Sequence, residues 1–275
     1  MVSCPGTVTL YPRCISLLRL IPAASVLDAL LAAFSAFGRY VLLLVRAARS
    51  LRELRLYRQN WIDEMVRIGI ESLPIVLMAA SFSGAVLTLQ AGYQLSTYFV
   101  PDLFIGAIVG PSIILELAAV SSGFVLASRV GARIAAELGS MRVSEQIDAL
   151  EVMGLNAVGY LVVPRVLAGV VMFPMLYVAA CVVGLGASVL AGDITGFVSP
   201  ATFWEGARQF YEPFDPYFGL IKAVTFGFII TSVACYQGYT CTAGAEGVGR
   251  STTDAVVLSC VGILAADLLL AVLLL

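Results

Sequence analysis

Long stretches without charged residues dominate the chain and are separated by shorter polar segments. A helix needs about 20 predominantly apolar residues to cross the hydrocarbon core of a bilayer. Five stretches reach that length, at residues 68–90, 103–128, 161–191, 217–237 and 254–275. The pattern therefore predicts an all-α membrane protein with five transmembrane helices.

The stretch before the first of these spans has a different pattern. Between positions 26 and 58, polar residues recur at near-multiples of 3.6 and so share one helix face. They are Asp28, Ser35, Arg39, Arg46, Arg49 and Glu53. A helix with an arginine-rich face suits the membrane interface better than its interior. We therefore expect an interfacial amphipathic helix region at 26–66, with a sixth span as the alternative, and a poorly structured segment at 1–25.

Composition narrows the possible chemistry. The chain is 60% hydrophobic and 12% charged, which places it in the membrane class. It contains no His, which removes imidazole acid–base catalysis and most zinc chemistry. The single lysine, Lys222, lies in an apolar run and not in a phosphate-binding loop, so we expect no ATPase site in this chain. We find no catalytic constellation, metal-ligand spacing or nucleic-acid-binding pattern, and expect the six cysteines to be buried hydrophobes.

Arginine is distributed unevenly among the polar segments. Seven arginines lie between positions 39 and 67 and four between 129 and 165, whereas the loops at 91–102 and 192–216 carry only Arg208. Cytoplasmic loops carry an excess of Lys and Arg. The N-terminus is therefore expected in the cytoplasm, and five spans place the C-terminus on the other side.

A polar island from Arg129 to Gly154 separates the second and third spans. We expect two helices here, the first ending at Gly139 and the second starting at Ser140 or Ser144. Each helix carries an apolar stripe: Ile134, Leu138 and Met141 on the first, and Val143, Ile147 and Leu150 on the second. Stripes left uncovered beside charges of both signs predict that the island docks into a groove of a partner.

Three ionisable residues lie within predicted spans: Glu116, Lys222 and Asp267. Each costs at least about 2.5 kcal/mol at the bilayer centre on insertion scales, so each is expected to face protein or water and to find a partner. One cation and two carboxylates can neutralise each other in part. Two interpretations remain open, a polar site for a lipid head group or a proton, and a packing clamp between helices.

Two long motifs carry a family resemblance. The first, RVGARIAAELGSMRVSEQIDALEVMG, is followed by VVPR, and the second, YQGYTCTAGAEGVGRSTTDAVV, is followed by Asp267. Together they resemble the MlaE (YrbE) family, the permease subunits of ABC-type lipid transporters that work with MCE proteins. The resemblance runs from about residue 38 to the end, and it makes 67–275 a permease domain with a coupling region at 129–156.

The resemblance implies a homodimer in the inner membrane of a diderm bacterium, with a periplasmic C-terminus. It implies a separate cytoplasmic ATPase that binds the ATP and docks on the coupling region, and a periplasmic MCE-domain protein that exchanges phospholipid. The ATPase-coupling residues would be Arg133, Glu137, Arg142, Glu145, Gln146 and Asp148. The lipid-binding residues would be Leu87, Gln90, Leu95, Tyr98, Phe99 and Glu116, and Lys222 and Asp267 match intramembrane charges of the family.

The chain departs from the family pattern at two places. Where the family often has Arg-Glu-Leu-Gly-Pro, this chain has Leu115-Glu116-Leu117-Ala118-Ala119, so the arginine beside the carboxylate is missing. Lys222 is then the remaining candidate cation for a phosphate. After Asn156 the usual proline is Ala157.

We interpret the chain as the membrane subunit of an ATP-driven phospholipid transporter that alternately exposes a cavity at the dimer interface. One alternative is a secondary transporter that uses Glu116 or Asp267 as a proton carrier. It predicts transport driven by a pH gradient, and inverted repeats, which we do not detect, would favour it. The other is a scaffold that only holds partners, which predicts no lipid in its cavity.

Overall fold

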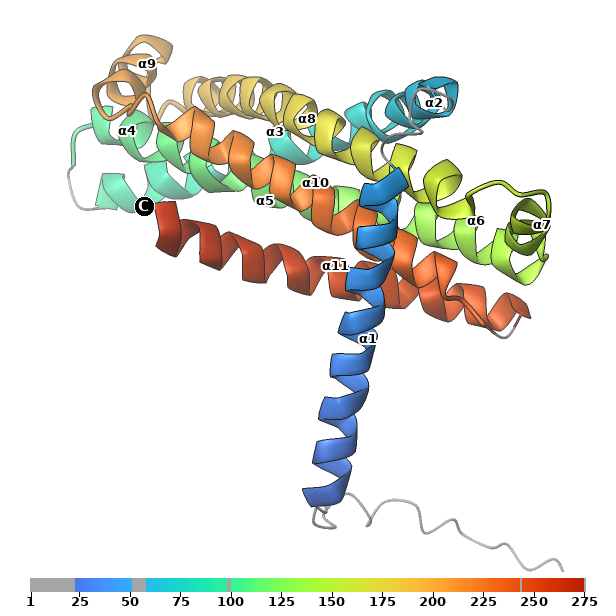
Figure 1. Ribbon diagram of the computed structural model, residues 1–275. Coiled ribbons are helices and arrows are strands. Elements are labelled where there is room, and N and C mark those ends of the chain that lie inside the picture. The colour runs from blue at the N-terminus through green and yellow to red at the C-terminus, as the bar shows by residue number, and fades with distance from the viewer. Residues whose placement is uncertain (1–22, 51–57, 98–99, 243, 275) are drawn as a thin grey trace, which may run out of the picture. The chain divides into compact units, whose positions relative to one another are not determined.

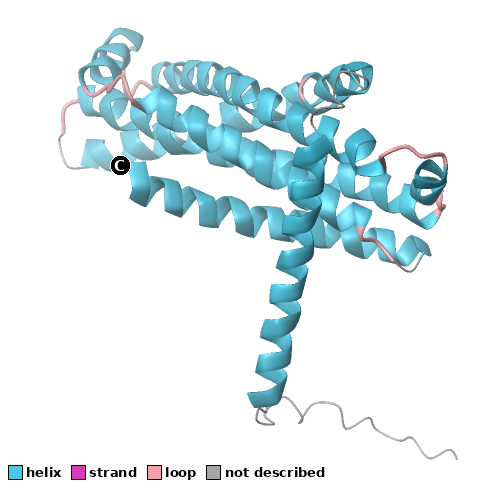
Figure 2. Ribbon diagram, in the orientation of Figure 1, coloured by secondary structure: helices cyan, strands magenta, loops and turns pink. Residues whose placement is uncertain are grey.

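The computed structural model describes residues 23–50, 58–97, 100–242 and 244–274, and within this part of the chain every regular element is a helix (Figures 1 and 2). The chain divides into two compact units, residues 1–42 and 43–275, with the boundary inside α1 (Ala23–Ser50). The expectation of a poorly structured N-terminus falls almost wholly outside the described residues, although α1 already begins at Ala23.

Five helices in the described residues are long and apolar enough to cross a membrane, which confirms the number predicted from the sequence. The first runs from Arg58 to Thr97 and comprises α2 (Arg58–Ile68), a short 3-10 turn and α3 (Leu73–Thr97). The third is α8 (Ala157–Thr195), the fourth α10 (Asp215–Tyr239) and the fifth α11 (Gly244–Leu274). α1 is not among the five, and its place at the membrane interface stays a prediction.

The second long helix continues without a break into the polar island. It contains α4 (Leu103–Ser112), α5 (Ala118–Leu126) and α6 (Ala132–Val143), joined by wide π-helical turns at Ile113–Leu117 and Ala127–Gly131. The island's first helix is thus an extension of the second span. Its second helix is α7 (Gln146–Val152), which follows Glu145 in the left-handed conformation at φ 59°.

The prediction that Gly139 ends a helix was wrong. α6 runs through this glycine to Val143, and neither Ser140 nor Ser144 caps the next helix. A Cβ on Gly139 would meet Val248 and Cys241 at 3.4–3.6 Å, which is ordinary van der Waals contact, so the packing at this position does not require glycine.

Most of the island's apolar stripes are covered by the protein itself, which corrects the expectation that a partner must cover them. Ile134, Leu138 and Ile147 are fully buried, because α6 packs along α10 and α11 and α7 contacts α6 and α8. The exposed apolar side chains are Val143 of the second stripe, at 39%, and further along Val152 and Met153, at 89% and 65%.

Residues 43–274 form a bundle with α10 at its centre. Of the most apolar part of α10, 61% is buried, against 11% for α11, and α10 packs against α8, α11 and α6. Figure 1 shows α7 at one end of this bundle and α9 (Pro200–Gln209) at the other. α9 was not expected from the sequence; Ser199 caps it, accepting a hydrogen bond from the Thr202 amide at 3.2 Å.

Gly106 and Gly110, four residues apart on α4, pack against α9. A Cβ on Gly106 would lie 2.1 Å from the carbonyl oxygen of Phe203, and one on Gly110 would lie 3.0 Å from Ala207. Glycine therefore lets α9 lie directly on α4 at this end of the bundle.

Candidate functional site

The three ionisable residues of the predicted spans meet in one cluster, which we call the lysine triad. Lys222 on α10 forms ion pairs with Glu116, in the first π-helical turn, and with Asp267 on α11, where Nζ and Oδ1 are 2.8 Å apart. The lysine Nζ also lies 4.5 Å from the centre of the Phe218 ring, a favourable cation–π position. Three separate helices thus place their charged groups around one ammonium.

The three side chains of the lysine triad differ in burial, and their formal charges do not cancel. The Lys222 side chain is fully buried, whereas 22% of Asp267 and 46% of the Glu116 side chain remain exposed. One cation between two carboxylates leaves a formal charge of −1. Since the buried lysine cannot reach solvent, it depends on its two partners, while Glu116 has free surface with which to meet another group.

The π-helical turn that carries Glu116 is fixed from its other side. Tyr177 on α8 donates a hydrogen bond from its hydroxyl to the carbonyl oxygen of Ile114 at 2.7 Å. Wide turns of this kind are frequent at functional sites because they alter the local direction of side chains and carbonyls. Here the turn places Glu116 toward α10, and the Ile114 carbonyl accepts its hydrogen bond from another helix, α8.

An open hollow lies along α3 and reaches the π-helical turn Ile113–Leu117 at Leu117. Its lining is mostly apolar and consists of Phe82, Ser83, Val86, Leu87, Gln90 and Leu117, around a volume of about 380 Å³. Two of the predicted lipid-binding residues, Leu87 and Gln90, therefore line one groove. Leu117 connects this groove to the neighbouring Glu116.

The remaining predicted lipid-binding residues have different positions. Leu95 is partly buried and packs against the apolar core near the end of α3. Tyr98 and Phe99 lie outside the described residues. The structure thus brings Leu87, Gln90 and the turn of Glu116 together, and it does not place Leu95 in the same groove.

The second charged cluster lies toward the α7 end and joins α2, α6 and α8. We call it the arginine network, and it consists of Glu64, Arg67, Glu71, Arg133, Glu137 and Arg165. Arg165 is 8% exposed and pairs with Glu64 at 3.2 Å and with Glu137 at 3.0 Å. Arg133 pairs with Glu71 at 3.1 Å. Three acids and three bases balance, so the cluster is formally neutral.

The arginine network includes two of the residues predicted to couple to an ATPase, Arg133 and Glu137. Sequence reasoning missed their partners Glu64 and Arg165, although Arg165 ends the VVPR segment that follows the island. A charge inside an otherwise apolar helix was the available signal, because such a charge needs a partner.

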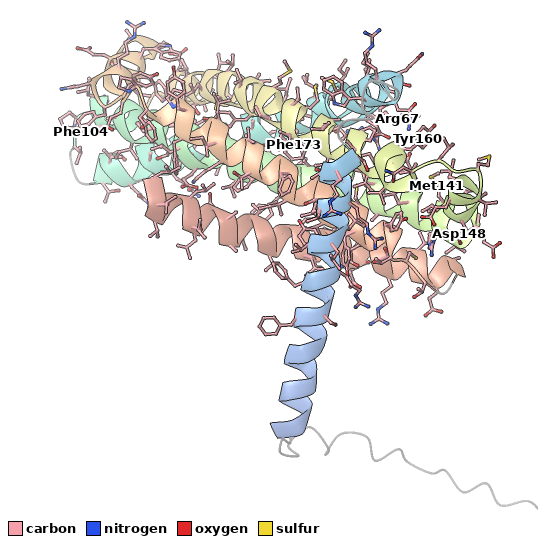
Figure 3. The ribbon with its side chains drawn as sticks, viewed as in Figure 1. Arg67, Phe104, Met141, Asp148, Tyr160 and Phe173 are labelled. Atoms are coloured by element: carbon pink, nitrogen blue, oxygen red, sulfur yellow. The ribbon has the colours of Figure 1, made fainter. Side chains whose placement is uncertain are left out.

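The other predicted coupling residues lie on and before α7. Arg142, at the end of α6, forms an ion pair with Asp148, which is labelled in Figure 3. Glu145 and Gln146 are exposed at the sharp turn between the two helices. The structure therefore places Arg142, Glu145, Gln146 and Asp148 together on the α7 end, separate from Arg133 and Glu137.

A contact between α7 and α10 was also missed. The Tyr239 hydroxyl donates a hydrogen bond to Glu151 Oε1 at 2.9 Å, and the Arg142 guanidinium lies 5.9 Å from the centre of the same tyrosine ring. Tyr239 belongs to the second long motif and Glu151 to the first. A pair 88 positions apart gives no local signal in the sequence, so only the fold reveals the contact.

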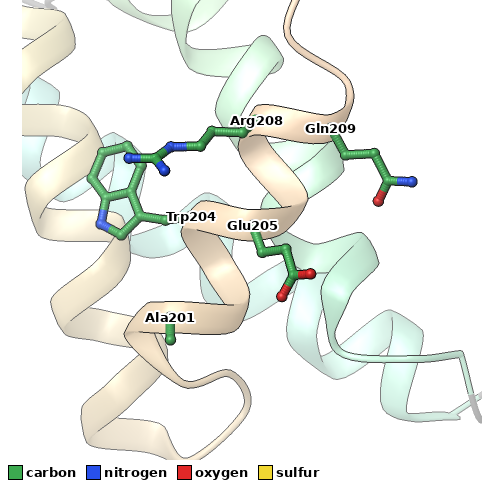
Figure 4. Close-up of a pocket in the computed structure, with 5 residues that line it drawn as sticks. All are labelled: Ala201, Trp204, Glu205, Arg208 and Gln209. Atoms are coloured by element: carbon green, nitrogen blue, oxygen red, sulfur yellow. The ribbon is translucent and has the colours of Figure 1, made fainter.

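The opposite end of the bundle carries a shallow hollow on α9. Ala201, Trp204, Glu205, Arg208 and Gln209 line it (Figure 4). Trp204 and Arg208 extend to the same side of the helix, while Glu205 and Gln209 point elsewhere. An exposed tryptophan beside an arginine is typical of a residue pair at a membrane–water interface.

Within the described residues, no group of three metal-ligating side chains is close enough to hold an ion. Four cysteines, Cys181, Cys235, Cys241 and Cys260, are free thiols there, and Cys4 and Cys14 lie outside the described part. The chemistry available is thus ion pairing and hydrogen bonding around an apolar groove.

Comparison with known proteins agrees with this geometry. The family described as "Permease MlaE" matches residues 61–273. A probable ABC transporter permease protein of Rickettsia bellii is 40% identical over 233 residues, covering 85% of this chain and 90% of that protein.

Two further relatives come from another bacterium and from a plant. The intermembrane phospholipid transport system permease protein MlaE of Haemophilus influenzae is 32% identical over 239 residues, 86% of this chain and 91% of its own. The chloroplast protein TRIGALACTOSYLDIACYLGLYCEROL 1 of Arabidopsis thaliana is 36% identical over 216 residues, 78% of this chain and 61% of its own.

The match spans all five long apolar helices, both charged clusters and both motifs from which the resemblance was first inferred. The chain is therefore a multi-pass membrane protein that belongs to the MlaE permease family.

Proposed function

We propose that this chain is the transmembrane permease of an ABC-type transporter that moves phospholipid between the inner membrane and a periplasmic MCE-domain protein. The observation that carries the proposal is the apolar groove of α3, whose lining includes Leu117, the residue that follows Glu116 of the lysine triad. A phospholipid has an apolar body and a charged head, and the groove and the triad offer one surface for each. The Haemophilus relative, named for phospholipid transport, supports the same substrate class.

Energy for transport would come from a separate cytoplasmic ATPase that docks at the α7 end. Support comes from the arginine excess at this end, which predicts a cytoplasmic location. The exposed apolar residues Val152 and Met153 lie there beside the charged Glu145 and Asp148, a combination suited to a protein partner. The name of the Rickettsia relative, a probable ABC transporter permease, supports an ATPase partner.

The permease would act as a homodimer, with lipid entering between the two copies. The exposed apolar faces of α3 and α11 supply surface for lipid and for a second copy, as at Phe82 and Val261, with exposed fractions of 67% and 58%. Closure of two ATPases would move the α7 ends and alternately open the groove to the membrane and to the periplasmic partner.

The lysine triad also supports a second candidate, a proton-coupled transporter in which Glu116 or Asp267 carries the proton. Both carboxylates contact one buried lysine, so protonation of either would change the balance of charge around it. This candidate needs a pH gradient and no ATPase.

The test is to tag the chain in its native host, extract the membranes gently, and identify co-purifying proteins and lipids by mass spectrometry. We expect a P-loop ATPase, an MCE-domain protein and phospholipid. A chain that emerges alone and free of lipid, with both partners expressed, would overturn the proposal. Transfer of a fluorescent phosphatidylethanolamine driven by a pH gradient without ATP would establish the proton-coupled candidate instead.

A groove-filling variant sharpens this test. Leu87→Trp adds bulk to the lining of the groove and is expected to reduce the phospholipid recovered per permease severalfold while the ATPase still co-purifies. Val182→Trp, at a side chain that is 66% exposed on α8, serves as the matched control and is expected to leave lipid recovery unchanged. Equal lipid recovery from both variants would show that the groove of α3 is not the lipid site.

A further inference from the structure

Tyr239 lies where the two family motifs meet in space. It is the last residue of α10, and it contacts both ends of the α7 segment: its ring faces Arg142 before α7, and its hydroxyl bonds Glu151 near the end of α7. Arg142 in turn pairs with Asp148 within α7. One aromatic side chain thus closes a chain of contacts around the seven-residue helix.

The remaining attachment of α7 is slight. Ile147 is fully buried, but Asp148, Ala149 and Val152 are exposed, and the contacts of α7 with α8 are few. A short helix held by Ile147 and the partly buried Leu150 has little local stability of its own. The polar contacts to Tyr239 therefore add to the attachment of α7 to the bundle.

The helix that ends at Tyr239 also carries Lys222. Seventeen positions separate the two residues, a rise of about 25 Å along a helix. No proline interrupts α10 between them, and α10 is the most buried of the five long helices. A displacement at Tyr239 is therefore passed along one rigid element to the lysine triad.

We propose that Tyr239 is the positioning residue that fastens α7 to α10 and so transmits movement of α7 to Lys222. The proposal rests on the proposed function, in which α7 is where the ATPase acts. It assigns to the tyrosine hydroxyl a role in coupling, distinct from docking the ATPase and from binding lipid.

The first measurement needs no partner protein. Amide hydrogen exchange of the full-length chain in lipid nanodiscs is compared between the wild type and Tyr239→Phe, which keeps the ring over Arg142 and removes the hydroxyl. Exchange of the amides of α7 is expected to accelerate by about three- to tenfold, as for loss of one hydrogen bond of typical net strength. Unchanged exchange in α7 would overturn the proposal, whatever partner the permease has.

Two further variants separate this contact from general damage. Glu151→Gln keeps an acceptor oxygen for the Tyr239 hydroxyl and is expected to exchange nearly as the wild type does. Thr240→Val removes a hydroxyl from the next residue, which donates to the Tyr236 carbonyl at 2.7 Å, and is expected to leave α7 unaffected. An equal acceleration in Thr240→Val would show that α7 responds to any change at the end of α10, and would overturn the specific role of Tyr239.

The second measurement uses the complex from host membranes in proteoliposomes, with a fluorescent phosphatidylethanolamine as the probe. In Tyr239→Phe, the amount of co-purified ATPase and the rate of ATP hydrolysis are expected to stay near wild type, while lipid transferred per ATP falls at least threefold. Unchanged transfer per ATP would overturn the role in coupling. If the wild type itself recruits no ATPase, the proposed function fails, and hydrogen exchange still decides whether Tyr239 holds α7.

Discussion

The lysine triad and the arginine network both place charged side chains inside an apolar bundle, but they compensate these charges differently. The network matches three acids with three bases, and its central Arg165 is 8% exposed between Glu64 and Glu137. The triad surrounds one fully buried lysine with two carboxylates and leaves 46% of the Glu116 side chain exposed. The network is formally neutral, with a buried centre and exposed outer side chains such as Glu71 at 50%. The triad carries a formal charge of −1 around a cation that is completely buried.

The difference indicates that the two clusters have different roles. A formally neutral cluster with a buried centre is suited to holding α2, α6 and α8 in one arrangement. An open cluster with excess negative charge changes its energy whenever a proton, a cation or a zwitterionic head group arrives at Glu116. The triad is therefore the part of the bundle that is suited to respond to a substrate.

Arg165→Leu should produce the largest loss of stability. It leaves Glu64 buried without its nearest cation, and removing one partner of a buried ion pair typically costs about 3–5 kcal/mol. Thermal unfolding of the detergent-solubilised chain measures the effect. Arg165→Lys keeps the charge but loses the forked geometry, so its stability is expected to lie between those of the wild type and Arg165→Leu. A loss below about 1 kcal/mol for Arg165→Leu would mean that the network does not hold the helices together.

Lys222→Met should be milder for stability and more severe for transport. Two carboxylates lose their cation, but the exposed side of Glu116 can be hydrated, so we expect a cost of about 2–3 kcal/mol. Lipid transferred per ATP should fall to background. The combined Lys222→Met, Glu116→Gln and Asp267→Asn variant removes every charge and should regain stability without regaining transport. Recovery of transport in that variant would reduce the triad to a packing clamp.

Arg67→Ala should have the smallest effect of the three. Its ion pair with Glu137 spans 3.7 Å, and the two side chains are 49% and 37% exposed. Exposed pairs contribute about 0–1 kcal/mol, so the unfolding temperature should hardly move, and the shift should diminish further in high salt. A shift as large as that of Arg165→Leu would show that the rim of the network is as important as its centre.

The five spans were predictable because an apolar run of sufficient length is a local property of the sequence. The helical island was predictable in part, but the helix end expected at Gly139 was wrong, because α6 continues through this glycine to Val143. The apolar stripe of Ile134 and Leu138 was expected to be uncovered, because its burial by α10 and α11 depends on the tertiary fold and leaves no local signal. α9 was not predicted, because it is short and lies within a segment that was interpreted as a loop.

In the candidate site, too, single residues were predictable and their contacts were not. Glu116, Lys222 and Asp267 could be singled out individually, since any charge in a span demands a partner. Their meeting could be expected only in outline, because residues 116 and 222 lie 106 positions apart. The pair of Tyr239 and Glu151 gave no signal at all, since neither residue is unusual where it stands in the sequence.

The two π-helical turns of the second long helix have a consequence for its periodicity. Each wide turn absorbs an additional residue and resets the rotational phase of the next helical segment, so α4, α5 and α6 are three separately phased segments of one rod. Deleting one residue from Ile113–Leu117 would replace the wide turn by regular winding and leave the segments beyond it near their present phase. Deleting one residue from the regular α5 would instead rotate everything beyond it by about 100° and turn Arg133 and Glu137 away from Arg165. The angular setting of the arginine network therefore tolerates a deletion in the wide turn and not in the regular helix.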